Sequence, residues 1–215
     1  MVPGMAPLVS VITPTWDRHH SLTHRCMPSV ADQEYDGPIE HIIVSDGPDP
    51  VLEQMSFPSH VSYYQLPEHS PDNGRWGTKA RLYGIEQSRG EYICYLDDDD
   101  KYRPHHIDGL VSLLEAAPDA GFAYSVGLWM NGDNHSTVRE PFGSVPPIHG
   151  QIGTGTMMNR RWSLDTATWR DDGQQATIDW DLVERWLTAG MPYRFHPAHE
   201  VGTEFLPHPS EGFRY

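Results

Sequence analysis

Short apolar runs alternate with longer amphipathic stretches in the first hundred residues. Each run is five or six residues long and rich in β-branched or aromatic side chains, which is typical of buried strands. Apolar residues recur at helical spacing in the stretches between the runs. We expect strands at residues 8–13, 41–45, 61–65 and 92–96, and helices from Asp17 to about residue 31 and at residues 76–87.

Punctuating residues predict where these elements begin and end. We expect Pro14 to end the first strand, Asp17 to cap the helix that follows, and Gly90 to close the helix at residues 76–87. Strands and helices in this order favour right-handed crossovers and a mainly parallel sheet. The fold class predicted by the pattern is therefore α/β.

The second half of the chain continues the alternation less regularly. Residues 131–150 are rich in Gly, Asn, Pro and His without periodicity, so we expect a functional loop there. No repeat or linker divides the chain, and its length suits one domain over residues 1–215. The other expected elements are a helix at residues 105–116, strands at 121–130 and 151–158, and a helix at 177–189.

Composition and charge narrow the function classes. The formal net charge of −15 disfavours direct binding to nucleic acid or to an anionic membrane surface. No apolar run reaches the ~18 residues of a membrane span, and the N-terminal stretch lacks the features of a signal peptide. Cys26 and Cys94 are too few for a disulfide framework. We therefore expect a cytoplasmic protein.

The candidate chemistry centres on four consecutive aspartates, Asp97 to Asp100, which follow an apolar strand. Ligand crevices of open α/β sheets form at this edge. Two carboxylates about 4 Å apart repel by about 4 kcal/mol at an effective dielectric of 20, and a bound cation turns that cost into a gain. Hard oxygen ligands select Mg²⁺ or Mn²⁺. The alternative is a solvated acidic turn that caps the next helix.

Four segments occur in a characteristic order: VSVITPTWDR, IIVSDGPD, GTKARLYGIEQSRGEYICYLDDDD and TIDWDLVERWLTAGMPYRF. Over about residues 8–208 the chain resembles a family 2 glycosyltransferase of the GT-A fold. The resemblance implies a Rossmann-like three-layer α/β/α sandwich with a mainly parallel central sheet. Its nucleotide-binding half would be about residues 1–100 and its acceptor-binding half about 101–215. It also implies a nucleotide-sugar donor, Mn²⁺ or Mg²⁺, and inverting transfer to a hydroxyl of an unknown acceptor.

The resemblance carries over site residues one by one. Asp46 matches the aspartate that receives the base, commonly uracil, although Ser45 and Pro48 depart from the family's Asp-Asp-Gly-Ser. In the Asp-x-Asp motif, Asp97 approaches the ribose or metal and Asp99 coordinates the metal, with Asp98 as a substitute. The residues that the resemblance places at the nucleotide are Thr13, Pro14, Thr15, Arg18, Asp46, Arg81, Asp97 and Asp98.

The resemblance also identifies Asp179 as the general base, because it stands where the family has Glu-Asp-Trp-Asp-Leu, here with Ile178 in place of Glu. A helix N-cap is the alternative role for Asp179, and more so for Asp181. His208 loosely matches a C-terminal histidine that reaches the metal, with His199 as a substitute. Pro207 replaces an arginine of that motif.

Two other functions remain open at this stage. A nucleotidyltransferase that makes nucleotide-sugars would require a Gly-rich basic loop after the first strand, where this chain has Thr15-Trp16-Asp17-Arg18. A degenerate nucleotide- or sugar-binding module would not need Asp179. Donor sugar, acceptor and oligomeric state have no signature in the sequence.

Overall fold

Two β-sheets organise the chain in the computed structural model, which describes residues 6–70, 77–130, 138–171 and 178–206. Within these residues, a seven-stranded sheet has the order β10-β6-β9-β4-β1-β2-β3. Its strands are β1 (Val9–Thr15), β2 (Ile39–Ser45), β3 (Val61–Gln65), β4 (Tyr92–Tyr95), β6 (Phe122–Ser125), β9 (Met157–Arg160) and β10 (Tyr193–His196). All neighbours pair in parallel except β9, which is antiparallel to both β4 and β6.

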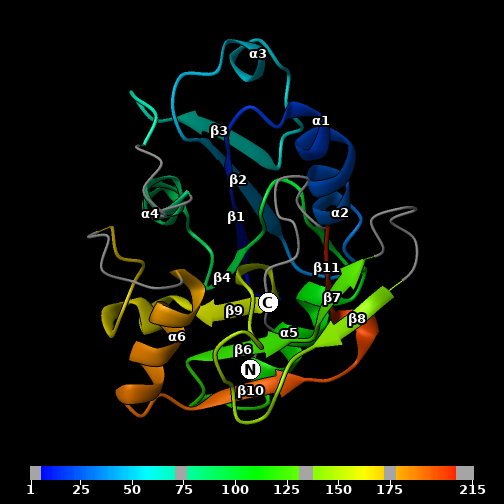
Figure 1. Cartoon of the computed structure of the whole chain (residues 1–215), viewed down its shortest axis with the longest axis vertical. Coiled ribbons are helices and arrows are strands. Elements are labelled where there is room, and N and C mark those ends of the chain that lie inside the picture. Colours follow the sequence, from blue (N-terminus) through cyan, green and yellow to red (C-terminus); the bar gives the residue numbers. More distant parts are fainter. Residues whose placement is uncertain (1–5, 71–76, 131–137, 172–177, 207–215) are drawn as a thin grey trace.

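Helices cover both faces of this sheet (Figure 1). One face carries α1 (His19–Ser21), the π-helical turn η1 (Leu22–Cys26), α2 (Met27–Ala31) and α5 (His106–Glu115), and the other carries α4 (Thr78–Gln87) and α6 (Ile178–Thr188). Val11 of β1 packs toward Leu22 and Ile107, whereas the next residue, Ile12, packs toward Leu182. This alternation builds two cores and confirms the mainly parallel three-layer α/β/α sandwich.

A smaller four-stranded sheet lies beside the main one, with the order β5-β11-β7-β8. Its strands are β5 (Lys101–Tyr102), β7 (Gly127–Met130), β8 (Val138–Phe142) and β11 (Thr203–Phe205). The expected strand at residues 121–130 is thus two strands, because the chain leaves the main sheet after β6 and enters the small sheet as β7. At Gly127 a Cβ would lie 1.9 Å from the Phe142 ring, so the packing of this ring over β7 leaves no room for a side chain there.

The structure corrects several expected boundaries. β1 continues through Pro14 to Thr15. Pairing with β4 ends at Ile12 while pairing with β2 continues, so the missing N–H of Pro14 costs no ladder bond. Asp17 adopts a left-handed conformation with φ 53° instead of capping a helix, and Arg18 occupies the N-cap. Helix α4 ends at Gln87 with an extended Ser88, so Gly90 is not its C′ residue.

The less regular half departs further from expectation. Part of the expected loop at residues 131–150 is strand β8. The strand expected at 151–158 is a 3₁₀ turn, η2 (Thr154–Thr156), followed by β9. The remaining short elements are α3 (Pro50–Glu53), η3 (Arg161–Asp165) and η4 (His199–Val201). Within the described ranges, no helix is both long and apolar enough to cross a bilayer.

Candidate active site

The candidate site lies at the edge of the main sheet where the parallel strands β1, β2 and β4 end. Thr15 is the last residue of β1, Asp46 follows β2, and Asp97 comes two residues after β4. Because parallel strands end at the same edge, Thr15, Asp46 and Asp97 lie along one edge of the sheet although 31 and 51 positions separate them in sequence. The predicted nucleotide-contacting residues are therefore collected by the topology of the sheet.

Asp97 to Asp100, called here the aspartate loop, joins β4 to β5, and its four side chains have different surroundings. The side chains of Asp97 and Asp99 are 34% and 24% exposed, whereas Asp98 and Asp100 are buried. Burial, followed by the charges of Asp99 and Asp97, raises the pKa of Asp100 well above its usual value. Asp97 and Asp99 are thus the two carboxylates of the loop that a ligand can reach.

Asp98 ties the aspartate loop to the end of β1. Its Oδ2 accepts a hydrogen bond from Thr15 Oγ1 at 2.7 Å, and its Oδ1 lies 3.3 Å from Arg18 Nη1. Burial raises the pKa of Asp98 to about 7, and the bond from Thr15 opposes that rise. The same Arg18 Nη1 lies 2.5 Å from Asp99 Oδ2. Thr15 and Arg18 therefore hold the loop, and Asp98 is occupied with them.

Arg81 of α4 joins the aspartate loop to the other half of the chain. Its guanidinium donates to Asp97 Oδ1, and its side chain is 4% exposed. The Arg81 Cζ lies 5.2 Å from the ring centroid of Trp169, which is buried and also meets Tyr95 edge-on at 5.0 Å. A cation held against an aromatic face in this way has little freedom to move. Trp169 thus fixes the direction of Arg81.

Asp179, the predicted base, lies in the first turn of α6 and is partly buried. Its Oδ1 accepts a hydrogen bond from the backbone N–H of Trp180 at 2.8 Å. Burial raises the pKa of Asp179, whereas the Trp180 bond and the Arg81 charge lower it and the Asp97 charge raises it. Asp179 is thus close enough to Arg81 and Asp97 for their charges to affect its pKa.

Asp181, two residues further along α6, has a different environment. Its carboxylate lies 2.8 Å from Arg185 Nη2 and 3.0 Å from Arg185 Nε, and it also accepts from Arg170 Nε at 3.2 Å. The Arg170 bond attaches α6 to the preceding segment, whereas the Arg185 bonds lie within α6. Asp181 is therefore occupied structurally, although by ion pairs rather than as a cap.

The other end of the site surrounds Asp46, which is buried. Its Oδ1 accepts from Ser70 Oγ at 2.8 Å, and its carbonyl accepts from His69 Nδ1 at 2.7 Å. The His69 ring stacks on Trp16 with a centroid distance of 4.1 Å. Gly47, at φ +133°, lies beneath this stack, where a Cβ would be 2.7 Å from the Trp16 ring. Only glycine fits there.

Sequence reasoning missed Trp16, His69 and Ser70. Trp16 stands inside the VITPTWDR segment, so its place beside the expected nucleotide loop was the one available signal. His69 and Ser70 follow β3 without any pattern and reach Asp46 only through the fold. The conformation of the chain after β3 therefore decides what surrounds Asp46.

Two residues of β1 that were predicted to contact the nucleotide, Thr13 and Pro14, pack against other parts of the protein. The Thr13 hydroxyl lies within the core, 2.9 Å from His41 Nε2 and 3.5 Å from Cys26 Sγ, so its side chain does not face the crevice. Pro14 packs against Gly77, where a Cβ would lie 2.7 Å from the Pro14 Cβ. Pro14 thereby supports the start of α4 and, through it, Arg81.

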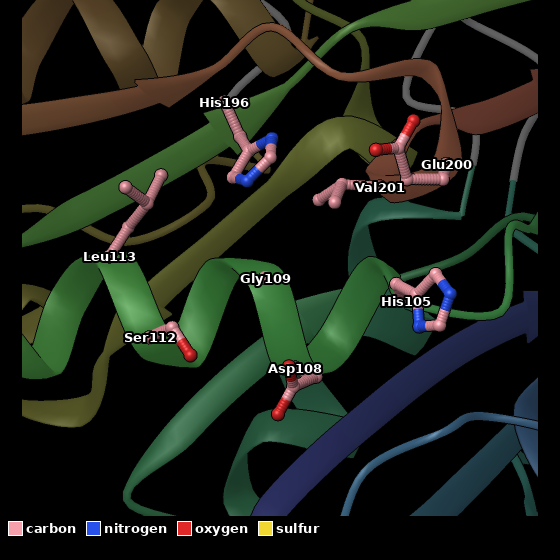
Figure 2. Close-up of a pocket in the computed structure, with 8 residues that line it drawn as sticks. All are labelled: His105, Asp108, Gly109, Ser112, Leu113, His196, Glu200 and Val201. Carbon is pink, nitrogen blue, oxygen red and sulfur yellow. The ribbon is translucent and has the colours of Figure 1, made fainter.

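Of the two predicted histidines, only His199 lies within the described residues, and it stands apart from this constellation. His208 lies outside the described residues, so its role stays a prediction. His199 is exposed on η4, which packs against α5. A depression of about 390 Å³ lies between α5 and η4, with no residue of the aspartate loop in its wall (Figure 2). It is lined by His105, Asp108, Gly109, Ser112, Leu113, His196, Glu200 and Val201.

The model of Glycosyl transferase family 2 matches residues 10–168, about three quarters of the chain. This chain belongs to glycosyl transferase family 2. The match includes every predicted nucleotide-binding residue and the aspartate loop, whereas Asp179 lies beyond its end.

Relatives agree with membership of the glycosyltransferase family, and solved structures share the fold of this chain. An uncharacterized glycosyltransferase of Rickettsia typhi is 32% identical over 205 residues, covering 89% of this chain and 62% of the relative. An N-acetylglucosaminyltransferase of Azorhizobium caulinodans is 27% identical over 121 residues, covering 54% and 30%. The crystal structure of S. aureus TarS residues 1–349 with UDP has a TM-score of 0.67 at 18% identity, covering 94% of this chain and 61% of that one. The expected GT-A fold is confirmed, and the chain spans less than two thirds of these proteins.

The donor set of this family 2 chain fits a hard divalent cation. Within the described residues, no three His, Cys, Asp or Glu side chains converge on a metal position. Mg²⁺ sites commonly take only one or two carboxylates, with substrate phosphates and water completing the shell. Asp97 and Asp99 supply two partly exposed carboxylates of this kind, now paired with Arg81 and Arg18.

Proposed function

We propose that this chain transfers a sugar from a UDP-sugar to an acceptor hydroxyl, with inversion at the anomeric carbon, a divalent metal and Asp179 as general base. The observation that supports it is the constellation of Asp97, Arg81 and Asp179. Arg81 of α4 donates to Asp97 of the aspartate loop, and the charges of both residues act on Asp179 in the first turn of α6.

Neighbours and relatives support the choice of donor. TarS of S. aureus has been crystallised with UDP and with UDP-GlcNAc, and a Rhizobium meliloti N-acetylglucosaminyltransferase is 29% identical over 121 residues. In this chain the surroundings of Asp46, with the Trp16 ring beside it, would receive the uracil end of the donor. UDP-GlcNAc is therefore the first donor to test.

The aspartate loop would hold the metal and the diphosphate. Asp99 would be the ligand, Asp97 would lie toward the ribose or metal, and His208 is the proposed additional ligand. When bound, Mn²⁺ or Mg²⁺ neutralises the charge that develops on the leaving diphosphate. Arg81 and Arg18 already oppose carboxylates at this position, and from there their guanidinium groups would donate to phosphate oxygens when a nucleotide arrives.

Asp179 would accept the proton of the acceptor hydroxyl. The acceptor oxygen forms a bond to the anomeric carbon while the bond from that carbon to the diphosphate oxygen breaks, and the electron pair leaves with the nucleoside diphosphate. A base works best when its pKa lies near the working pH, and burial moves the pKa of Asp179 in that direction. The proton ends on the Asp179 carboxyl group.

A donor screen tests the proposal. The purified chain is incubated with UDP-, GDP- and dTDP-sugars, with Mn²⁺, with Mg²⁺ or with EDTA, and release of nucleoside diphosphate is measured. We expect release from a UDP-sugar that EDTA abolishes. Release that is unaffected by EDTA would contradict the metal role, and release of pyrophosphate from UTP plus a sugar phosphate would identify a nucleotidyltransferase instead. UDP binding without any release would identify a binding module.

A further inference from the structure

Arg25 contacts the aspartate loop through its backbone. Its Nε donates a hydrogen bond of 2.8 Å to the carbonyl oxygen of Asp99, and its side chain is 16% exposed. Arg18 contacts the carboxylates of Asp98 and Asp99, so the two arginines approach the same loop from one helical segment in different ways. The Arg25 contact engages the Asp99 backbone and not its carboxylate.

Glu204 of β11 holds Arg25 from the other side. Its Oε2 lies 3.6 Å from Arg25 Nη2, and its Oε1 lies 2.6 Å from Arg103 Nε. Glu204 is 5% exposed, and a carboxylate this deeply buried requires cationic partners. Because β11 pairs with β5, the strand directly after the loop, Glu204 is itself fixed relative to the loop.

The local backbone aims Arg25 at the loop. Arg25 lies in the π-helical turn η1, between α1 and α2. Such turns are rare and are found frequently at functional sites, because the extra residue redirects a side chain relative to a regular helix. The adjacent Cys26 is buried against Thr13, which fixes the turn to β1. The π-helical turn thus delivers one arginine to one carbonyl.

We propose that Arg25 is a positioning residue for the aspartate loop and that Glu204 holds Arg25 in place for this role. The inference rests on the proposed function, since the loop is the proposed metal and diphosphate site. When a loop is already held in its binding geometry, binding free energy is not spent on ordering it, and the affinity is higher. Loss of the Arg25 bond therefore weakens metal-dependent nucleotide binding without removing any ligand atom.

Arg103 provides the matched control. Arg25→Met and Arg103→Met each remove one cation from Glu204, but only Arg25 touches the aspartate loop. Either variant leaves Glu204 with one partner, so both are expected to lose thermal stability, and Arg25→Met by the larger amount because Arg25 also opposes the charges of Asp100 and Asp99. The double variant Arg25→Met/Glu204→Gln removes the buried charge as well, so it provides a stable protein that still lacks the bond to Asp99.

Two readouts separate positioning from general stability. The first is amide hydrogen exchange of residues 97–102 without metal, and the second is the calorimetric Kd for UDP with and without Mn²⁺. In Arg25→Met and in the double variant we expect about tenfold faster exchange and an about tenfold weaker Kd in Mn²⁺, equivalent to about 1.4 kcal/mol. Arg103→Met is expected to stay within about twofold of wild type in both.

Each outcome decides one point. Equal changes in Arg25→Met and Arg103→Met, or no change in either, would overturn the role of Arg25. Wild-type protein that binds UDP equally well with Mn²⁺ and with EDTA would refute the proposed metal dependence instead. In that case the exchange measurement still decides whether Arg25 positions the loop.

Discussion

Two buried histidines predict how the stability of this protein depends on pH. His41 on β2 and His106 at the start of α5 are fully buried. Burial lowers the pKa of His41 to about 3 and the pKa of His106 to about 4, whereas both titrate near 6.5 in an unfolded chain. Because the folded-state pKa is the lower one, their contribution to stability is complete above about pH 6.5 and is lost as the pH falls toward the folded-state values.

The size of the effect follows from these values. Below about pH 6.5 each buried neutral histidine costs about 1.4 kcal/mol of unfolding free energy per pH unit, or about 2.8 kcal/mol for the pair at pH 5.5. Total stabilities of about 5–15 kcal/mol make this a large fraction. Asp98 acts in the opposite direction, because burial raises its pKa to about 7 and protonation of the folded state stabilises it as the pH falls.

Differences between wild type and variants isolate the histidines from Asp98. His41→Gln keeps a polar atom near Thr13 Oγ1, and His106→Asn keeps a donor for the Val201 carbonyl, which His106 Nδ1 contacts at 2.7 Å. Urea unfolding is measured in EDTA at pH 7.5, 6.5 and 5.5. Relative to each variant, wild type should lose about 1.4 kcal/mol between pH 7.5 and 5.5. Parallel curves over this range would refute the assigned pKa shifts.

Three further predictions concern the site and the core. Asp179→Asn should lower the maximal transfer rate by about 100-fold or more with unchanged UDP affinity. Asp181→Asn should instead lower the melting temperature and largely keep the rate. Steady-state kinetics and thermal scans of both variants check this prediction. Asp99→Asn should remove the Mn²⁺ dependence of UDP binding in calorimetry and change the melting temperature little, because partly exposed ion pairs contribute about 0–1 kcal/mol. Gly84→Ala should destabilise the fold by about 1–3 kcal/mol in urea unfolding, because its Cβ would lie 2.6 Å from the Ile12 Cγ2.

Elements with a strong local pattern were predictable from the sequence. The strands expected at 41–45, 61–65 and 92–96 correspond to β2, β3 and β4, because β-branched and aromatic residues form short runs there. The helices expected at 105–116 and 177–189 correspond to α5 and α6, because apolar residues recur there at helical spacing. The strands β5, β10 and β11 were missed, since two to four residues carry no period and these strands form only by pairing with distant partners.

The candidate site divides in the same way. Asp46 and the aspartate loop were predictable, because each follows an apolar strand whose end the pattern reveals. The family resemblance singled out Asp97 and Asp99, but the local pattern could not separate them from the buried Asp98, since four identical residues in a row differ only in what the fold places beside them. Arg25 and Glu204 are 179 residues apart, and no local pattern relates them.

The antiparallel strand β9 has a consequence for the behaviour of the chain while it is being synthesised. Strand β4 pairs with β1 on one side and with β9 on the other, and its residues Tyr92–Tyr95 are all buried. On the ribosome, β4 emerges more than sixty residues before Met157. Until then the nascent sheet ends in an apolar strand with unpaired backbone groups, which is the kind of edge that recruits other chains. The strand that completes the sheet late is thus a central one, β9, and not an edge strand. Chains released before β9 is made should therefore aggregate.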